Sequence, residues 1–85
     1  MTDANTRAPF ILFGTGACHL CENAEAMLRS AREAGTDFNY EKVDISESDA
    51  LFERYGILIP VLRHPAGAEL NWPFSPQQLA VFLAS

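Results

Sequence analysis

The sequence is poor in positive charge and has no long apolar run. Its 85 residues include six lysines and arginines against eleven aspartates and glutamates, which gives a formal net charge of −5. Because nucleic acids and anionic membranes bind basic surfaces, this balance argues against both as partners. The apolar run from Phe10 to Phe13 is too short for a signal-peptide core, and no run approaches the length of a membrane span. We therefore expect a cytoplasmic protein.

The chain is also short, and its length leaves room for one domain. Eighty-five residues build a single hydrophobic core. Residues 1–8 are polar and without periodicity, so we interpret them as a loose leader and place a single domain at residues 9–85. No repeat or low-complexity segment interrupts this domain. We expect it to be a monomer with no tightly bound cofactor.

Cysteine and histidine are scarce as well. The chain has two cysteines, Cys18 and Cys21, and two histidines, His19 and His64. A structural zinc site normally takes four Cys or His ligands, and His64 is far from the other three along the chain, so we expect no metal site. What is present is a Cys-x-x-Cys pair after a glycine-rich turn, at the point where an apolar strand gives way to an amphipathic helix.

The position of this pair predicts redox chemistry. A helix N-terminus has unpaired N–H groups and the positive end of the helix dipole, which favour a thiolate over a thiol. A spacing of three residues puts both sulfurs on one face of the helix, close enough to form or open a disulfide. We therefore predict that Cys18 is the nucleophile that attacks a substrate disulfide and that Cys21 resolves the mixed disulfide.

Other interpretations of the pair are weaker. A structural disulfide closing so short a loop would stabilise the fold little, because the entropic gain grows with loop length. Two buried thiols acting as small apolar side chains would not require this spacing after a glycine-rich turn. His19 is a candidate for lowering the pKa of Cys18, but adjacent helical residues point in different directions, which favours a solvent-facing His19.

The first half of the chain predicts two strands and two helices. Residues 10–13 predict a central strand, and residues 38–45 predict a second one. Between them lies a helix that ends at Gly35 and pairs Glu25 with Arg29 on its polar face. Its apolar face consists of Leu20, Ala24, Met27, Leu28 and Ala31. Ser46 is the predicted N-cap of a short helix, with Asp49 in its first turn. That helix carries Leu51, Phe52 and Tyr55 and closes at Gly56.

The second half of the chain predicts a hairpin and a last helix. Residues 57–62 are apolar enough for a buried strand, and Pro60 belongs at a strand's beginning because it cannot donate to the ladder. A turn at residues 65–67 and the return of residues 68–72 complete the hairpin. Ser75, Pro76 and Gln78 predict a capping box for the last helix. The order β-α-β-α-β-β-α then builds a three-layer α/β/α domain on a four-stranded mixed sheet.

Four sequence segments carry a resemblance to a known family. They are Cys18-His19-Leu20-Cys21-Glu22, Val43-Asp44-Ile45, Tyr55-Gly56-x-x-Ile59-Pro60-Val61-Leu62 and Leu70-x-Trp72-Pro73-Phe74. Together with the element order, they resemble the thioredoxin fold in its short glutaredoxin form, and in particular a glutaredoxin-like family of small, mostly bacterial proteins. The resemblance runs from about Pro9 to the C-terminus.

The resemblance implies two further site residues, Ile59 and Pro60. Thioredoxin-fold proteins keep a cis proline beside the active-site cysteine, and the residue before it offers its backbone to an extended substrate. A kink at Pro60 stops the strand from pairing onward and would leave the N–H and C=O of Ile59 free to bind a peptide or glutathione. A trans proline at the start of an edge strand is the alternative.

The resemblance also makes glutathione a candidate reductant or substrate. The chain departs from typical glutaredoxins at this point, with His19-Leu20 in place of Pro-Tyr between the cysteines. It also lacks a basic residue just before the motif and a Gly-Gly-x-x-Asp-like segment after the hairpin. Glu22, next to Cys21, would disfavour a thiolate if its carboxylate faced the sulfurs.

Two hypotheses of different classes follow. The first is a thiol–disulfide oxidoreductase that acts on protein disulfides, glutathione mixed disulfides or other small-molecule disulfides. The second is a binding module that presents Ile59-Pro60 and the region of Trp72 to a partner, with cysteines that respond to oxidation without turnover. Iron–sulfur delivery, which resembles the role of some glutaredoxins, is a third hypothesis by analogy of fold alone.

Overall fold

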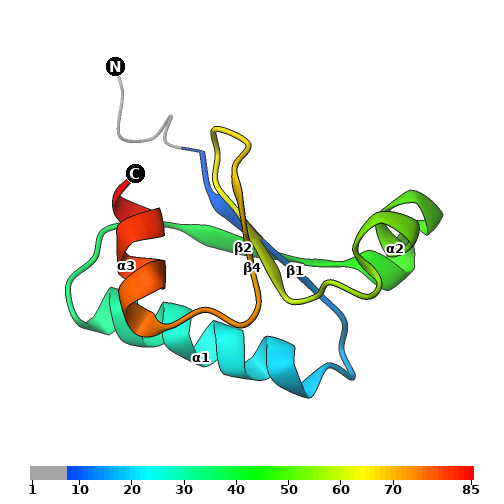
Figure 1. The fold of residues 1–85 in the computed structure, drawn as a ribbon, viewed down its shortest axis with the longest axis horizontal. Coiled ribbons are helices and arrows are strands. Elements are labelled where there is room, and N and C mark those ends of the chain that lie inside the picture. Colours follow the sequence, from blue (N-terminus) through cyan, green and yellow to red (C-terminus); the bar gives the residue numbers. More distant parts are fainter. Residues whose placement is uncertain (1–7) are drawn as a thin grey trace.

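The computed structural model describes residues 8–85, so the predicted leader at residues 1–8 lies outside the described residues apart from Ala8. The order of elements is the predicted one, with a short 3-10 helix added after the second strand (Figure 1). The elements are β1 (Phe10–Gly14), α1 (His19–Glu33), β2 (Tyr40–Asp44), η2 (Ile45–Glu47), α2 (Asp49–Tyr55), β3 (Val61–Arg63), β4 (Glu69–Asn71) and α3 (Pro76–Ala84). Within residues 8–85, none of the helices has the length and apolar character needed to cross a membrane.

The four strands form one mixed sheet in the order β2-β1-β3-β4. The central strand β1 runs parallel to β2, with Gly14 level with Asp44, and antiparallel to β3, with Phe13 level with Val61. Strands β3 and β4 form the predicted hairpin, whose turn is closed by a 2.8 Å hydrogen bond from the Gly67 N–H to the His64 carbonyl. The carboxyl ends of β1 and β2 therefore meet at the same end of the sheet.

Side chains of β1 alternate between two apolar cores, one on each face of the sheet. Leu12 packs with Leu28 of α1 and Leu79 of α3 in one core. In the other core, Phe13 stacks on the ring of Tyr55 from α2, with 4.3 Å between ring centroids. Figure 1 shows α3 beside α1, with α2 apart from both. The predicted three-layer α/β/α architecture on a four-stranded mixed sheet is confirmed.

The buried face of α1 differs from the predicted one at its start. The buried residues are Cys21, Ala24 and Leu28, at positions i, i+3 and i+7. Leu20, which was predicted on the apolar face, is 46% exposed. Because Cys21 turns toward the sheet, its neighbour Leu20 turns toward solvent.

The start of α2 also differs from the prediction. Ser46 is not its N-cap, because the N–H and hydroxyl of Ser46 both donate to the Asp44 carboxylate, which caps η2. The N-cap of α2 is Ser48, whose hydroxyl accepts the N–H of Leu51 at 3.3 Å. The polar side chain of Asp44 thus inserts an extra turn before the helix.

The third strand begins later than predicted. The prediction of a strand over residues 57–62 is wrong in its first half, because β3 begins at Val61 and Ile57 is 97% exposed. The N–H groups of Leu58 and Ile59 donate to the Tyr55 carbonyl and continue the turn that ends α2. Ladder pairing starts after Pro60, which has no N–H to donate.

Candidate active site

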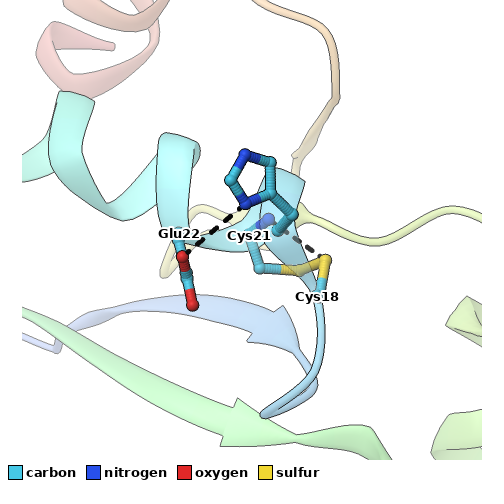
Figure 2. Close-up of a disulfide and its surroundings, with 4 residues drawn as sticks. Cys18, Cys21 and Glu22 are labelled. Atoms are coloured by element: carbon cyan, nitrogen blue, oxygen red, sulfur yellow. Dashed lines mark hydrogen bonds and ion pairs between the residues drawn. A yellow bond between two sulfur atoms is a disulfide. The ribbon is translucent and has the colours of Figure 1, made fainter.

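The two cysteines are joined by a disulfide at the start of α1, a few residues past the carboxyl end of β1 (Figure 2). Their Cα atoms are 5.2 Å apart. Cys18 is the N-cap of α1, and its Sγ accepts a 3.1 Å hydrogen bond from the backbone N–H of Cys21. The Cys18 N–H donates to the Thr15 carbonyl at 3.3 Å. The Cys18 sulfur therefore lies among the N–H groups that stabilise a thiolate at a helix N-terminus.

The two sulfurs differ in their environment. Cys21 is buried, with 8% of its surface exposed, whereas Cys18 is half-buried. A Cβ at Gly14 would lie 2.8 Å from the Sγ of Cys21, so the missing side chain of Gly14 lets Cys21 pack over the end of β1. In thiol–disulfide exchange an incoming partner reaches the more accessible sulfur, which here is that of Cys18.

The register of the sheet makes Pro60 level with Gly14, the glycine near Cys21. The antiparallel pairing of β1 with β3 makes Gly14 level with Pro60, one position beyond the last paired residues. Neighbouring strands lie about 4.8 Å apart, so Pro60 is adjacent to the glycine that Cys21 covers. The Pro60 carbonyl accepts the Trp72 N–H at 3.2 Å, which extends the pairing between β3 and β4 by one more hydrogen bond.

The hydrogen bonding of Ile59 differs from the predicted one. The Ile59–Pro60 peptide bond is cis, and Ile59 packs at the edge of the apolar cluster that contains Tyr55. The Ile59 N–H donates to the Tyr55 carbonyl at 3.1 Å. The prediction that this N–H is free is therefore wrong, because the turn after α2 uses it. A role of Ile59 and Pro60 in substrate binding stays a prediction.

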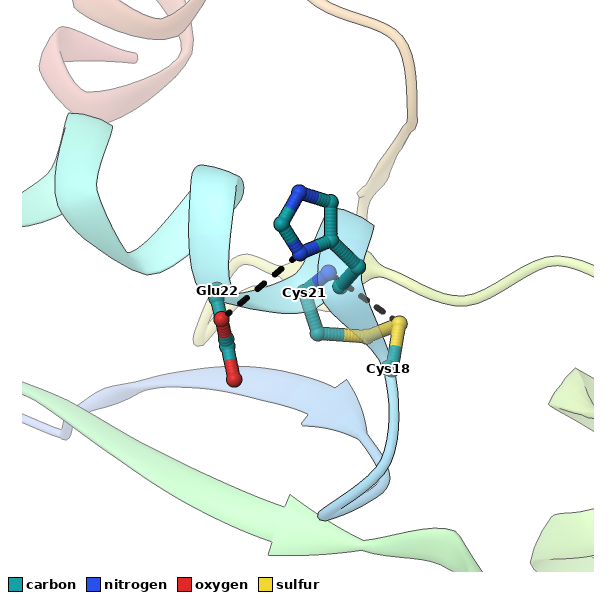
Figure 3. Close-up of polar contacts among 4 residues, drawn as sticks. Cys18, Cys21 and Glu22 are labelled. Atoms are coloured by element: carbon teal, nitrogen blue, oxygen red, sulfur yellow. Dashed lines mark hydrogen bonds and ion pairs between the residues drawn. A yellow bond between two sulfur atoms is a disulfide. The ribbon is translucent and has the colours of Figure 1, made fainter.

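His19 and Glu22 face each other on the exposed side of the first helical turn. The Nδ1 atom of His19 lies 3.9 Å from Oε1 of Glu22, and the two side chains are 85% and 72% exposed. Figure 3 shows Glu22 together with the two cysteines at the start of α1, with its carboxylate joined to the imidazole by the dashed line. His19 thus lies in solvent, and its role in tuning Cys18 stays a prediction.

A cavity of about 250 Å³ adjoins the disulfide, between the start of α1 and the edge strand β2. Its lining includes Gly14, Cys21, Glu22, Glu25, Lys42 and Asp44. The Asp44 carboxylate accepts hydrogen bonds from the hydroxyl and the N–H of Ser46, at 2.7 and 2.9 Å. These two bonds lower the pKa of Asp44.

Glu25 connects α1 to β2 at this cavity. The Tyr40 hydroxyl donates to Oε2 of Glu25 at 2.9 Å, and the Lys42 ammonium donates to Oε1 at 3.2 Å. Burial raises the pKa of Glu25, but the hydrogen bonds from Tyr40 and Lys42 and the positive charges of Lys42 and Arg29 together outweigh it, so the pKa is lowered. Burial and the bond to Glu25 raise the pKa of Tyr40. The charge of Arg29, the predicted partner, also lowers the pKa of Glu25, but the hydrogen-bond partners of Glu25 lie on β2.

Comparisons with known proteins agree with this geometry. The family model of the glutaredoxin-like domain (DUF836) matches residues 10–84. The chain belongs to this family. The predicted resemblance and fold class are therefore confirmed. Among curated proteins, none matches the chain.

Solved structures similar to this glutaredoxin-like domain come from structural genomics. The X-ray structure of protein XcR50 from X. campestris has 40% identity and a TM-score of 0.78, with 88% of this chain and 95% of that chain covered. The solution structure of XcR50 gives a TM-score of 0.74 with 91% and 94% covered. Protein Ne2328 from Nitrosomonas europaea has 25% identity and a TM-score of 0.73, with 87% and 88% covered.

The geometry of this glutaredoxin-like domain supports a redox-type function. Cys18 and Cys21 lie close together at the N-terminus of a helix, as their spacing predicts. Among residues 8–85, no group of three or more His, Cys, Asp or Glu side chains is placed to hold a metal ion. Sequence reasoning missed Tyr40 and Lys42, although their spacing of two along a strand indicates that both face the same layer.

Proposed function

We propose that this glutaredoxin-like domain is a thiol–disulfide oxidoreductase in which Cys18 is the nucleophile and Cys21 the resolving thiol. The observation that carries the proposal is the disulfide at the start of α1, in which the half-buried Cys18 sulfur accepts the N–H of a buried Cys21. A helix N-terminus lowers the pKa of a thiol by stabilising the thiolate. This favours Cys18 as the attacking sulfur.

Each step of the proposed cycle exchanges one S–S bond for another. The Cys18 thiolate attacks a sulfur of the substrate disulfide, forming a mixed disulfide and releasing one substrate thiolate. Cys21 loses its proton to water and attacks the Cys18 sulfur, which forms the Cys18–Cys21 disulfide and releases the second substrate thiolate. The substrate gains two electrons, and the dithiol loses two. A thiol donor then reduces the domain by the reverse exchange.

We further propose that an extended substrate segment lies beside Pro60, next to the position that Cys21 covers. Because the Ile59 N–H is already bonded, contact with this segment would use the Ile59 carbonyl and side chain. Protein disulfides and small-molecule disulfides are both candidate substrates, and glutathione is a candidate reductant or substrate. The proposed setting is the cytoplasm, where dithiols are kept reduced between catalytic events.

The test compares the reduced parent protein with Cys18→Ser and Cys21→Ser. We expect Cys18→Ser to reduce bis(2-hydroxyethyl) disulfide no faster than the uncatalysed reaction, because it has lost the attacking sulfur. Cys21→Ser should retain the attack and accumulate a mixed disulfide, which mass spectrometry detects as an added substrate half. Ala17→Ser is the matched control, since it adds a hydroxyl next to Cys18 and leaves both sulfurs in place. It should keep the parent activity.

The alternative is a binding module whose cysteines respond to oxidation without turnover. The exposed side chains of Ile57 and Leu58, just ahead of Pro60, favour it because they offer apolar surface to a partner. This alternative predicts a Cys18 pKa near the ordinary thiol value of about 8.5 and no disulfide reduction. Reduction by Cys18→Ser at the parent rate would overturn the oxidoreductase proposal.

A further inference from the structure

Charged side chains are unevenly distributed around the disulfide. The cavity beside Cys21 is lined by the carboxylates of Glu22, Glu25 and Asp44 and by the amine of Lys42. The Lys42 ammonium lies 3.2 Å from Glu25, so these two charges offset each other. In the described part of the chain, no lysine or arginine lies within 4 Å of Glu22 or Asp44. Glu22 lies 3.9 Å from the exposed imidazole of His19, which is cationic only when protonated. When His19 is neutral, both carboxylates therefore lack a cationic partner among residues 8–85.

Both carboxylates lie close enough to act on a bound substrate. Asp44 is level with Gly14, the residue over which Cys21 packs, and its hydrogen bonds from Ser46 favour the ionised form. Glu22 directly follows Cys21 and lines the same cavity as Cys21 and Asp44. Charges closer than the screening length, about 10 Å at 0.1 M salt, interact with an incoming charged molecule.

We propose that Glu22 and Asp44 make this redox site select disulfides by charge, favouring cationic and neutral disulfides over anionic ones such as glutathione disulfide. The inference rests on the proposed oxidoreductase function and names its substrate class. An anionic disulfide is repelled as it approaches Cys18, whereas a cationic one is attracted. A favoured protein substrate would carry a lysine or arginine next to its reactive cysteine.

The test measures how fast three small disulfides oxidise the reduced protein. Glutathione disulfide is anionic, bis(2-hydroxyethyl) disulfide is neutral and cystamine is cationic. The reaction is run at about pH 8, where an ordinary histidine is neutral. It is quenched with a maleimide, and the remaining thiols are counted by mass spectrometry. We expect Glu22→Gln to raise the ratio of the glutathione disulfide rate to the cystamine rate by roughly two- to fivefold at low salt. The effect should shrink at about 1 M salt, where the screening length is about 3 Å.

The control is Glu33→Gln, at the far end of the same helix. It changes the net charge equally but lies away from the disulfide, so the rate ratio should stay at the parent value. A change in the reactivity of Cys18 itself multiplies all three rates equally and cancels in the ratio. If Glu22→Gln leaves the ratio unchanged while all three disulfides still react, charge selection is overturned and the oxidoreductase proposal stands. If none of the three disulfides oxidises the parent dithiol, the oxidoreductase proposal itself fails.

Discussion

Gly14 lies where β1 ends and the side chain of Cys21 packs over the strand. A Cβ at this position would lie 2.8 Å from the Sγ and 3.1 Å from the Cβ of Cys21, which is buried and held by the disulfide. We therefore expect Gly14→Ala to lower the free energy of unfolding by about 1–3 kcal/mol, as overpacking does in protein cores. Urea unfolding of the oxidised protein measures this change.

Gly16 provides the matched control for this substitution, because a Cβ there meets no atom within 4 Å. Gly16→Ala should leave the free energy of unfolding unchanged or raise it by up to about 1 kcal/mol, since alanine restricts the unfolded chain. An unfolding free energy of Gly14→Ala equal to that of the parent would contradict the close approach of Cys21 to β1.

At the scale of single residues, the position of the cysteine pair was easier to predict from the sequence than the burial of its neighbours. The spacing of Cys18 and Cys21 after an apolar strand is a local signal, and it placed the pair correctly at the start of α1. The exposure of Leu20 was not predictable in the same way. Cys21, Ala24 and Leu28 are buried together on one face of α1, and the approach of Cys21 to Gly14 depends on how the helix packs against the sheet.

At the scale of elements, α3 begins with a complete capping box. The Ser75 hydroxyl accepts the Gln78 N–H at 3.0 Å, and the Gln78 side chain accepts the Ser75 N–H at 2.8 Å. We expect Ser75→Ala to lower the free energy of unfolding by about 1 kcal/mol, because α3 holds Leu79 in the core. Ser30→Ala, at an exposed position inside α1, should be neutral or slightly stabilising. Equal urea midpoints for the two variants would contradict a stabilising role of the cap.

Element boundaries were predictable where one residue decides them and not where two compete. The capping box at Ser75 follows from the chemistry of that residue. The start of β3 at Val61 agrees with the missing N–H of Pro60, but the apolar run from residue 57 led to a predicted strand that began too early. The start of α2 does not follow from a single residue, because Asp44 and Ser48 each offer a side-chain acceptor to nearby N–H groups. Asp44 caps the short turn η2, which moves the N-cap of α2 from the predicted Ser46 to Ser48.

At the scale of the whole molecule, the candidate site depends on how α1 is held against β2. Glu25 receives hydrogen bonds from Tyr40 and Lys42, which are 15 and 17 residues away along the chain. A periodicity analysis of α1 alone suggests Arg29 as the partner, because it considers only neighbours on the same helix. The partners Tyr40 and Lys42 come from β2, which lies beside β1 in the sheet. The same pairing brings Asp44 next to Gly14.

This contact between α1 and β2 predicts how stability changes with pH. A lowered pKa of Glu25 means that its contribution is present above the ordinary value of 4.5 and is lost as the pH falls through the lower value of the folded protein. The raised pKa of Tyr40 means that its contribution to the free energy of unfolding is present below pH 10.0 and is lost as the pH rises through the higher folded value.

We expect Tyr40→Phe to lower the free energy of unfolding by about 1 kcal/mol at pH 7, as the loss of one hydrogen bond does. At about pH 2.5, well below the ordinary carboxylate values, the loss should be smaller, because Glu25 takes up a proton as the pH falls through its lowered pKa. Urea unfolding at both pH values tests this, and an equal loss at both would contradict a charge-assisted bond between Tyr40 and Glu25.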